Sequence, residues 1–559
     1  MWRYRVVLFF LFTCFFIVIA RLFYWQVVKA DQLALLGKSQ YGQEVTLLPQ
    51  RGQIETSDGF PIVANKLSYL VFANPKEITD KNREKVSLDL SSILKIDAAT
   101  ISADLNENLL WVPIKQNVSV DAKTEIENLQ IPGVGFEKQY SRFYPEASMA
   151  AQLVGFVGKD ISGNDKGYFG LEGYYNRLLR GEPGIAVQIH DAFGRPILAK
   201  ANNSSQINGS SLRLSINRAI QFIVEKKLKD GVKKYGAVSG MVGIMNPRTG
   251  AIIAMASYPS YDPGSYANYP DSLYANPFIS DLYEPGSTFK PIVMSGAIDQ
   301  GLITPETECP ICAGPVSVGG YKIHTWDNKY HKNTTMIKVM QHSDNTGMVF
   351  VAQTLGVSRM IDTLNKFGIG ETTGIDLQGE IAMPLKPKNL WYPVDLATTG
   401  FGQGISVTPI ELLDAISAIA NNGKRMEPHV VSEILTGNGN TIKIQPKVLD
   451  TPISKETAKV MTEILVNTAN NGESKWTRIK GYRIAGKTGT ASIPIDGHYD
   501  PTKTIASFIG YAPADHPKFA MLVILNKPSA AIYGSETAAP LFYAIARDLF
   551  IYYHIGPDD

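Results

Sequence analysis

The stretch YEPGSTFKP, residues 283–291, sets a hydroxyl and an amine one helical turn apart, directly behind a Pro-Gly break. Pro285 and Gly286 interrupt regular structure, so we expect a helix to begin at Ser287. Lys290 would then lie beside Ser287 on one face of that helix. A helix cap followed by an ordinary surface lysine explains this stretch alone equally well, so the rest of the chain must decide.

Two further motifs follow in a fixed order. The first is Ser-Asp-Asn at 343–345, within MQHSDNTGMVF, and the second is Lys-Thr-Gly-Thr at 487–490, within IAGKTGTAS. Each motif alone is a weak signal, because Ser, Asp and Asn also form turns and caps with their own backbone. Together with S-x-x-K they form the set known from penicillin-binding proteins and class A β-lactamases.

The chemistry of acyl transfer gives each side chain a reason to be there. The Ser287 hydroxyl is a poor nucleophile until a base removes its proton, and Lys290 is the candidate base. A lysine can serve as a base when burial or a nearby cation destabilises its ammonium, and Lys487 can supply that cation. Ser343 can relay a proton to the leaving amine, and Asn345 can hold a substrate amide.

The same residues provide an anion-binding site. An acyl-enzyme needs preorganised N–H donors for its oxyanion, and the backbone N–H groups of Ser287 and Thr490 are the candidates. Thr488 and Thr490 can bond a substrate carboxylate that Lys487 attracts, and we place Gly489 in the same substrate-binding set. This acyl transfer needs no metal and no organic cofactor.

Composition sets limits on the class of protein. The chain has 559 residues, 44% hydrophobic and 19% charged, which is a globular balance with room for several domains. The formal net charge is +2, and there is no long basic block that would suggest a nucleic-acid partner. Three cysteines are too few for a disulfide-stapled scaffold.

The N-terminus carries an export signal. Arg3 and Arg5 precede the apolar run at 6–20, which continues past Arg21 into LFYWQVV. About 20 mainly apolar residues can span a bilayer if Arg21 snorkels to the interface. We therefore predict a transmembrane anchor at 6–27.

This anchor would place the protein in the cell membrane as a single-pass protein. The positively charged tail at 1–5 would stay in the cytoplasm, and the rest of the chain would lie outside. The alternative is a cleaved signal peptide, with Val18 and Ala20 as the small residues before the cut.

The extracytoplasmic part reads as two domains with a boundary near residue 236. Residues 28–235 would form a linker and pedestal domain, with a partly helical stalk at 28–45 and a hairpin around 57–59. Residues 236–559 would form the second domain, which opens with a hairpin around the turn at 247–250.

Nearly the whole chain resembles the class B penicillin-binding proteins, which are membrane-anchored, monofunctional D,D-transpeptidases. The resemblance rests on the three motifs and on the segments at 51–65, 167–184, 245–263 and 396–431. It implies an α+β multidomain fold: one transmembrane helix, an elongated pedestal of the dimerisation-domain kind, and a penicillin-binding/serine β-lactamase-like transpeptidase domain. That last domain would be an antiparallel sheet flanked by helices.

The resemblance also implies the reaction. Ser287 would attack the D-Ala-D-Ala amide of a donor stem peptide, and the amine of an acceptor peptide would resolve the acyl-enzyme. β-Lactams would acylate Ser287. The family implies a membrane glycan polymerase (FtsW- or RodA-like) and division proteins as partners. The C-terminal part, from GYAPADHPKFAMLVIL onward, looks most like the division-type, FtsI-like branch, which implies septal synthesis.

Other functions remain open at this stage. An elongation-type transpeptidase would carry the same motifs, and a D,D-carboxypeptidase or β-lactamase-like hydrolase would use the same serine chemistry. A penicillin sensor or a structural scaffold would retain the site without turnover. The anchor and the large N-terminal part argue against a class A β-lactamase, which is small and soluble.

Two features depart from the family pattern. Asp344 stands where many class B members carry another small polar residue, although Ser343 and Asn345 keep the proposed roles. Cys309 and Cys312 outside the cytoplasm favour a local disulfide. A zinc site with His324 and His331 is the rival, although the spacing falls outside the usual range, and free thiols are the third possibility. Cys14 should only pack in the anchor.

Overall fold

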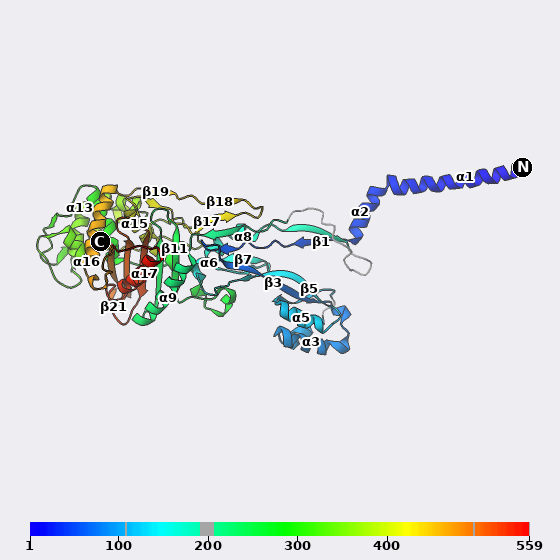
Figure 1. Ribbon diagram of the computed structural model, residues 1–559, viewed down its shortest axis with the longest axis horizontal. Coiled ribbons are helices and arrows are strands. Elements are labelled where there is room, and N and C mark those ends of the chain that lie inside the picture. Colours follow the sequence, from blue (N-terminus) through cyan, green and yellow to red (C-terminus); the bar gives the residue numbers. More distant parts are fainter. Residues whose placement is uncertain (107–108, 190–205, 496–497, 558–559) are drawn as a thin grey trace. The chain divides into compact units, whose positions relative to one another are not determined.

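The computed structural model describes residues 1–106, 109–189, 206–495 and 498–557 (Figure 1). The chain divides into two units. The first consists of residues 1–51 and 180–209, and the second of residues 52–179 and 210–559.

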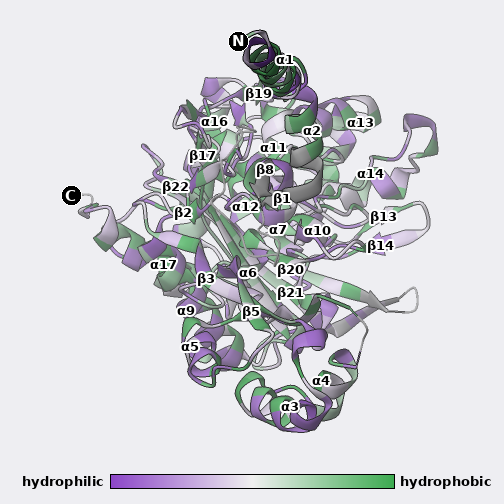
Figure 2. Ribbon diagram, turned by 90° about the vertical axis from the view of Figure 1, so that its right-hand side faces the viewer, coloured by the Kyte–Doolittle hydropathy of each residue, from purple (hydrophilic) through white to green (hydrophobic). Residues whose placement is uncertain are grey.

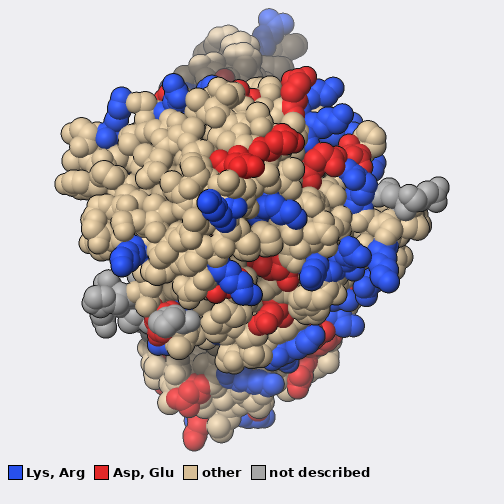
Figure 3. All heavy atoms as spheres, turned by 90° about the vertical axis from the view of Figure 1, so that its left-hand side faces the viewer, with Lys and Arg blue, Asp and Glu red and all other residues tan. Residues whose placement is uncertain are grey.

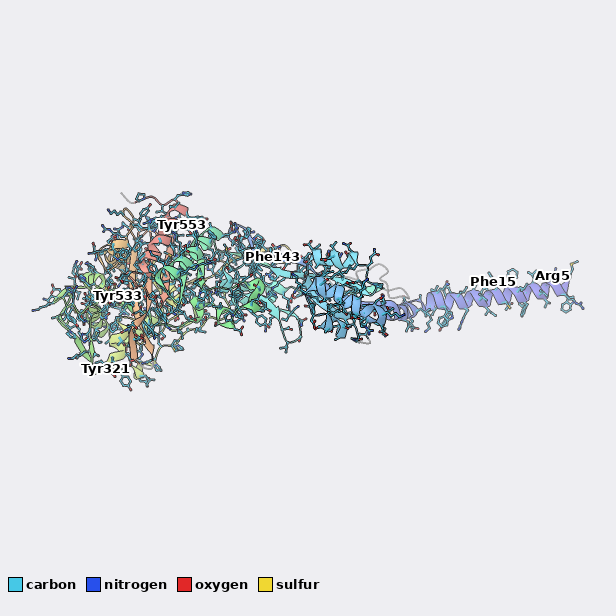
Figure 4. The ribbon with its side chains drawn as sticks, turned by 90° about the horizontal axis from the view of Figure 1, so that it is seen from below. Arg5, Phe15, Phe143, Tyr321, Tyr533 and Tyr553 are labelled. Atoms are coloured by element: carbon cyan, nitrogen blue, oxygen red, sulfur yellow. A yellow bond between two sulfur atoms is a disulfide. The ribbon has the colours of Figure 1, made fainter. Side chains whose placement is uncertain are left out.

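The first unit begins with one long apolar helix. Helix α1 (Trp2–Phe23) continues as a π-helical turn, η1 (Tyr24–Val28), and an 18-residue window of this 27-residue span has a mean hydropathy of 2.7 with none of it buried. In Figure 2 the ribbon of α1 has mostly the colour of hydrophobic residues, and Figure 4 shows Phe15 projecting from its side. Length and composition make it a candidate single-pass anchor. The Arg21 guanidinium lies over the Tyr24 and Trp25 rings, 5.8 and 5.1 Å from their centroids, as expected of a cation held at an aromatic belt.

The stalk after the anchor is partly helical, as predicted. Helix α2 (Ala30–Tyr41) leads into β1 (Gly42–Leu47), which pairs antiparallel with β8 (Gly184–Ile189). Two segments far apart in the sequence therefore form one ribbon.

A mixed sheet builds the pedestal part of the second unit. Its order is β18-β17-β9-β2-β3-β4, and β5 also pairs with β3. The strands are β2 (Ile54–Glu55), β3 (Pro61–Ala73), β4 (Val112–Val118), β5 (Val134–Phe143), β9 (Ser211–Leu214), β17 (Val431–Leu435) and β18 (Thr441–Lys443). The hairpin predicted around 57–59 is the β2–β3 turn. The sheet joins strands from both sides of residue 236, because β17 pairs with β9.

Three helices cover the far end of β3. Helices α3 (Asp80–Leu94), α4 (Ala98–Asp104) and α5 (Val120–Asn128) pack against it and share a small hydrophobic core. Val71 from the sheet and Leu90, Ile101 and Ile126 from the helices are at most 2% exposed. The shorter elements that follow are α6 (Ala151–Val154), β6 (Phe156–Lys159), β7 (Asp165–Tyr168), α7 (Gly170–Tyr174) and α8 (Asn176–Arg180).

A five-stranded antiparallel sheet forms the centre of the catalytic part, in the order β11-β10-β22-β21-β20. The strands are β10 (Ser239–Met245), β11 (Ile252–Tyr258), β20 (Ala485–Ile495), β21 (His498–Ala512) and β22 (Phe519–Asn526). The β10–β11 pair is the hairpin predicted around 247–250. Strand β20 lies at one edge, so one side of it is not covered by a neighbouring strand.

Helices cover both faces of this sheet. Helices α9 (Arg218–Tyr235) and α17 (Ala538–Tyr552) pack on one face, and α15 (Pro409–Ala420) and α16 (Lys455–Asn471) belong to the other layer (Figure 1). Helix α11 (Lys290–Asp299) packs with α15 and α16 in that second layer. Strand β22 reads FAMLVIL because alternate residues enter each core: Met521 and Val523 on the α9 side, Leu522 and Ile524 on the other. The antiparallel sheet flanked by helices is the predicted fold.

The remaining α-helices of the catalytic part lie around the layer that contains α11, α15 and α16. They are α10 (Pro277–Ser280), α12 (Met336–Gln341), α13 (Asn345–Lys366) and α14 (Pro393–Thr399). Short strand pairs lie between them, formed by β12 (Glu308–Cys309) with β15 (Thr334–Thr335), β13 (Val316–Val318) with β14 (Tyr321–Ile323), and β16 (Arg425–Met426) with β19 (Val448–Asp450).

Candidate active site

Ser287 lies in a tight helical turn that precedes the α-helix. The 3₁₀ turn η5 spans Gly286–Phe289, and α11 begins only at Lys290. The expectation that a helix begins at Ser287 with its hydroxyl as cap is therefore wrong in detail, because the turn starts at Gly286 and no side chain caps it. In a 3₁₀ turn the positions i and i+3 eclipse, so Ser287 and Lys290 still share one face. Ser287 is partly exposed, whereas Lys290 is fully buried.

Glycines let this turn approach strand β20 and the segment after α14 closely. A Cβ on Gly489 would stand 2.8 Å from Thr288 Cγ2, and a Cβ on Gly402 would stand 2.2 Å from the Gly286 carbonyl oxygen. The Gly286 N–H donates to the Gly402 carbonyl at 2.9 Å. The glycine of the K-T-G motif therefore serves close packing between the nucleophile turn and the sheet edge.

Ser343 joins the nucleophile to the buried lysine. Its Oγ donates to Ser287 Oγ at 2.9 Å, and Lys290 Nζ donates to Ser343 Oγ at 3.3 Å and to the Ser343 carbonyl at 2.6 Å. Ser343 has a φ of 56°, which is a left-handed conformation that a serine adopts only when its surroundings hold it there. The three side chains form one hydrogen-bonded chain, and rotation of the two hydroxyl protons turns it into a path for the Ser287 proton to Lys290 Nζ.

Burial favours the neutral amine of Lys290. Desolvation, and then the positive charge of Lys487, hold the pKa of Lys290 well below its usual range, while Glu473 and Asp344 raise it. This is the electrostatic arrangement that the sequence predicted for a lysine acting as a base.

Lys487 is also buried, and it lies in a short hydrogen-bond chain. Its Nζ donates to the Thr488 carbonyl and to Thr488 Oγ1, both at 3.0 Å, and Thr488 Oγ1 donates to Glu473 Oε2 at 2.6 Å. Burial lowers the pKa of Lys487, and the Glu473 carboxylate opposes that shift.

Asn345 and Thr490, the remaining predicted residues, each form hydrogen bonds with other parts of the site. Asn345 Oδ1 accepts from Lys290 Nζ at 2.9 Å, and its Nδ2 donates to the His324 carbonyl at 3.1 Å. Thr490 Oγ1 accepts from the Gly534 N–H at 2.9 Å, and a hydroxyl that accepts in this way can also donate its own proton. The Thr490 carbonyl faces the nucleophile turn, 3.4 Å from where a Gly286 Cβ would stand. In an antiparallel strand the N–H of a residue points to the same edge as its carbonyl, so the Thr490 N–H also faces η5.

Asp344 serves as a helix cap. Its Oδ1 accepts from the N–H groups of Thr346 (2.7 Å) and Gly347 (3.2 Å) and from the Thr346 hydroxyl (2.7 Å), which starts helix α13. A buried aspartate is a good N-cap, so the acidic residue in this motif has a structural reason.

A segment that contains a disulfide borders the site next to Asn345. Cys309 and Cys312 form a disulfide, which confirms the expected pairing and occupies both sulfurs that a zinc site would need. Trp326 Nε1 donates to the His342 carbonyl at 3.1 Å, next to Ser343, and the Trp326 ring meets that of Tyr533 edge-on at 5.6 Å. His324 Nδ1 shares a hydrogen bond of 2.9 Å with the Tyr330 hydroxyl, and the His331 ring stacks on that of His342.

The site lysines differ from the lysines of the surface. On the face drawn in Figure 3, acidic and basic side chains are interspersed among broad neutral areas. Lys290 and Lys487, in contrast, are at most 1% exposed. The positive charge of Lys487 acts on groups inside the site, where solvent screens it least.

Sequence reasoning missed Glu473. This residue follows α16 in the stretch NNGESKW, which contains no catalytic motif and reads only as a helix end. Its contact with Thr488 comes from the packing of α16 against β20, and nothing in the local sequence indicates it.

Comparisons with known proteins agree with this geometry. Residues 240–547 match the family model of the penicillin binding protein transpeptidase domain, and residues 46–214 match that of the penicillin-binding protein dimerisation domain. Stage V sporulation protein D of Bacillus subtilis is 33% identical over 98% of this chain and 85% of its own length. Peptidoglycan D,D-transpeptidase FtsI of Escherichia coli is 29% identical over 100% of this chain and 93% of its own.

A solved structure has the same fold along the chain. A peptidoglycan synthetase from Bifidobacterium adolescentis superimposes with a TM-score of 0.74 and 26% identity, covering 93% of this chain and 98% of the other. The fold and the site define a serine acyltransferase. This chain belongs to the penicillin-binding transpeptidases, within class B, and is a peptidoglycan D,D-transpeptidase.

Proposed function

We propose that this protein cross-links peptidoglycan stem peptides through an acyl-enzyme on Ser287 during septal wall synthesis. The observation that carries the proposal is the hydrogen-bonded path from Ser287 through Ser343 to a buried Lys290. A partly exposed serine connected to a lysine that favours its neutral form is the arrangement that a serine acyltransferase needs.

In the first half-reaction, Ser287 Oγ attacks the carbonyl carbon between the two D-alanines of a donor peptide. The proton of the hydroxyl passes along Ser343 to Lys290 Nζ. The peptide C–N bond then breaks, the leaving amine takes up a proton through Ser343, and D-alanine departs. The product is an ester between Ser287 and the shortened donor.

Binding of the donor uses the edge of the sheet. The N–H groups of Ser287 and Thr490 would hold the oxyanion, because both belong to the contact between η5 and β20. Lys487 would attract the terminal carboxylate, and the hydroxyl of Thr490 would donate to it. Thr488 would contribute through its contact with Lys487, and Asn345 would bind the donor amide while it remains bonded to Lys290.

In the second half-reaction, the amine of an acceptor stem peptide attacks the ester carbonyl. Lys290, neutral again, takes the amine proton through Ser343 and returns it to Ser287 Oγ as the ester bond breaks. An amide cross-link forms and the serine is regenerated. A β-lactam would follow the first half-reaction and remain attached to Ser287.

We further propose how the chain sits in its cell. The span Trp2–Val28 would remain as an uncleaved anchor in the cell membrane, with Arg3 and Arg5 in the cytoplasm and the catalytic part outside. We place the domain boundary near residue 236, where the left-handed Gly236 (φ 60°) ends helix α9. A membrane glycan polymerase would contact the anchor, and division proteins would contact the pedestal at 28–235.

Product analysis tests the reaction. Purified protein incubated with a D-Ala-D-Ala donor and an amine acceptor should give the cross-linked dimer and free D-alanine, and the Ser287→Ala variant should give neither. Products that are only hydrolysed donor would assign a D,D-carboxypeptidase instead. Loss of a fluorescent penicillin label within minutes would assign a β-lactamase.

The septal role needs a separate test in cells. Depletion should produce filaments, because septa fail while elongation continues. Round cells would contradict the septal assignment and would favour an elongation-type transpeptidase with the same chemistry.

A further inference from the structure

Glu473 contacts the K-T-G strand from a different element. Its carboxylate accepts from the Thr488 hydroxyl at 2.6 Å, and the Thr488 oxygen in turn accepts from Lys487 Nζ at 3.0 Å. Because Thr488 donates its hydroxyl proton to Glu473, it can only accept from Lys487, and its lone pairs face the Lys487 ammonium. Lys487, Thr488 and Glu473 form one hydrogen-bonded chain that ends at the Glu473 carboxylate.

The backbone fixes where Glu473 stands. Helix α16 ends at Asn471, and a Cβ on Gly472 would stand 2.4 Å from the Thr468 carbonyl oxygen and 2.9 Å from that of Gln341. On the other side, Ser474 is 2% exposed. Glu473 is held between a glycine that cannot carry a side chain and a buried serine, so its position is determined on both sides.

The charges that face this site come from four elements. Lys487 lies on β20, Lys290 on α11, Asp344 at the start of α13 and Glu473 after α16. Asp344 Oδ1 is already used by the first turn of α13. Among the described residues, Glu473 is the carboxylate that bonds the K-T-G motif.

We propose that Glu473 is a positioning residue of the transpeptidase site: acting through Thr488, it holds Lys487 in place and keeps that buried ammonium charged for the carboxylate of the donor or of a penicillin. This proposal rests on the proposed function, because it assigns the substrate carboxylate to Lys487. Glu473 itself does not touch the reacting atoms.

The consequence is a pH profile with a defined direction. Acylation should require a neutral Lys290 and a charged Lys487, so its rate should rise with pH on one limb and fall on the other. The Glu473 carboxylate raises the pKa of both lysines. Removal of that charge should move both limbs to lower pH, by about one pH unit for an opposite charge at this range. At a pH on the alkaline limb, one unit corresponds to about a tenfold loss of rate.

The experiment measures second-order acylation of the full chain in detergent by a fluorescent penicillin between pH 5 and 10. Glu473→Gln should show both limbs at lower pH, with a gain on the acid side and a loss on the alkaline side. Glu473→Asp restores the charge and should return the profile toward wild type. Glu463→Gln is the matched control, because Glu463 lies on α16 but pairs with Arg483 at the surface.

Each outcome is decisive. A Glu473→Gln profile that overlays wild type overturns the proposal, and so does an equal loss at every pH. If Glu473→Gln does not fold, Thr488→Val cuts the same hydrogen-bond chain while keeping the Glu473 charge, and acylation by that variant at the wild-type rate overturns the claim that Glu473 acts through Thr488. Failure of wild type to label, or equal labelling of Ser287→Ala, would instead overturn the proposed function.

Discussion

Asp344 offers a test of how the middle motif is held. The Asp344→Ala variant removes three hydrogen bonds, two of them to backbone N–H groups in the first turn of α13. Loss of an N-cap costs about 0.5–2 kcal/mol, and a buried donor left without a partner costs about 1–3 kcal/mol more. The free energy of unfolding should therefore fall by about 2–4 kcal/mol. For a domain of this size that corresponds to a fall in the thermal midpoint of roughly 4–10 °C.

Acylation should also slow in Asp344→Ala, because Ser343 and Asn345, the neighbours of Asp344, bond Lys290. Ser343 is in a left-handed conformation and Asn345 bonds Lys290 Nζ, so a loosened cap releases both. We expect acylation by a fluorescent penicillin to fall at least about a hundredfold, which is the scale of a misplaced catalytic group.

Asp344→Asn is the control. Asparagine keeps the capping oxygen, and Oδ2 has no hydrogen-bond partner among the described residues, so the amide should cost little stability. Because the Asp344 charge raises the pKa of Lys290, the acid limb of acylation should move to lower pH in this variant. Normal acylation by Asp344→Ala, measured below its melting range, would refute the claim that the cap positions Ser343 and Asn345.

Three further predictions concern packing, pH and the base. Gly402→Ala should destabilise the fold and abolish acylation. The added Cβ would stand 2.2 Å from the Gly286 carbonyl oxygen, and residue 402 has a φ of +77°. Gly314→Ala is the control: its Cβ meets open space, so this variant should melt like wild type. Burial raises the pKa of Asp414 to about 8 from 3.8, so the folded state binds a proton that the unfolded state releases, and stability should fall between about pH 4 and pH 8. Asp414→Asn should remove this dependence, so it should raise the thermal midpoint most at pH 8 and progressively less toward pH 4; a parallel pH dependence in both proteins would contradict this. Lys290→Ala should lose penicillin labelling yet keep a circular dichroism spectrum like that of wild type, and a variant that unfolds instead would make Lys290 a structural residue.

Local sequence patterns predicted the elements that depend on neighbouring residues. The hairpins around 57–59 and 247–250 follow from turn dipeptides between alternating strands. The Cys309–Cys312 disulfide is favoured because we expect this part of the chain to lie outside the cytoplasm. The three motifs also predicted which side chains meet in the site, because each motif contains residue types suited to acyl transfer.

The sequence did not predict contacts made over long distances in the chain. The route from Ser287 to Lys290 passes through Ser343, 56 residues away from Ser287, and depends on a left-handed φ that no serine signals in advance. The 3₁₀ geometry of η5 arises from its packing against β20, whereas local propensity indicated only a helix start. Glu473 reaches Thr488 only because α16 packs against the same strand.

The most direct test of the central claim is to locate the covalent adduct. The full chain, inactivated with benzylpenicillin and digested, should give one modified peptide by tandem mass spectrometry, with the penicilloyl group on Ser287. The Ser287→Ala variant should give no adduct. An adduct on another serine, or no adduct on a folded wild-type protein, would contradict the acyl-enzyme account.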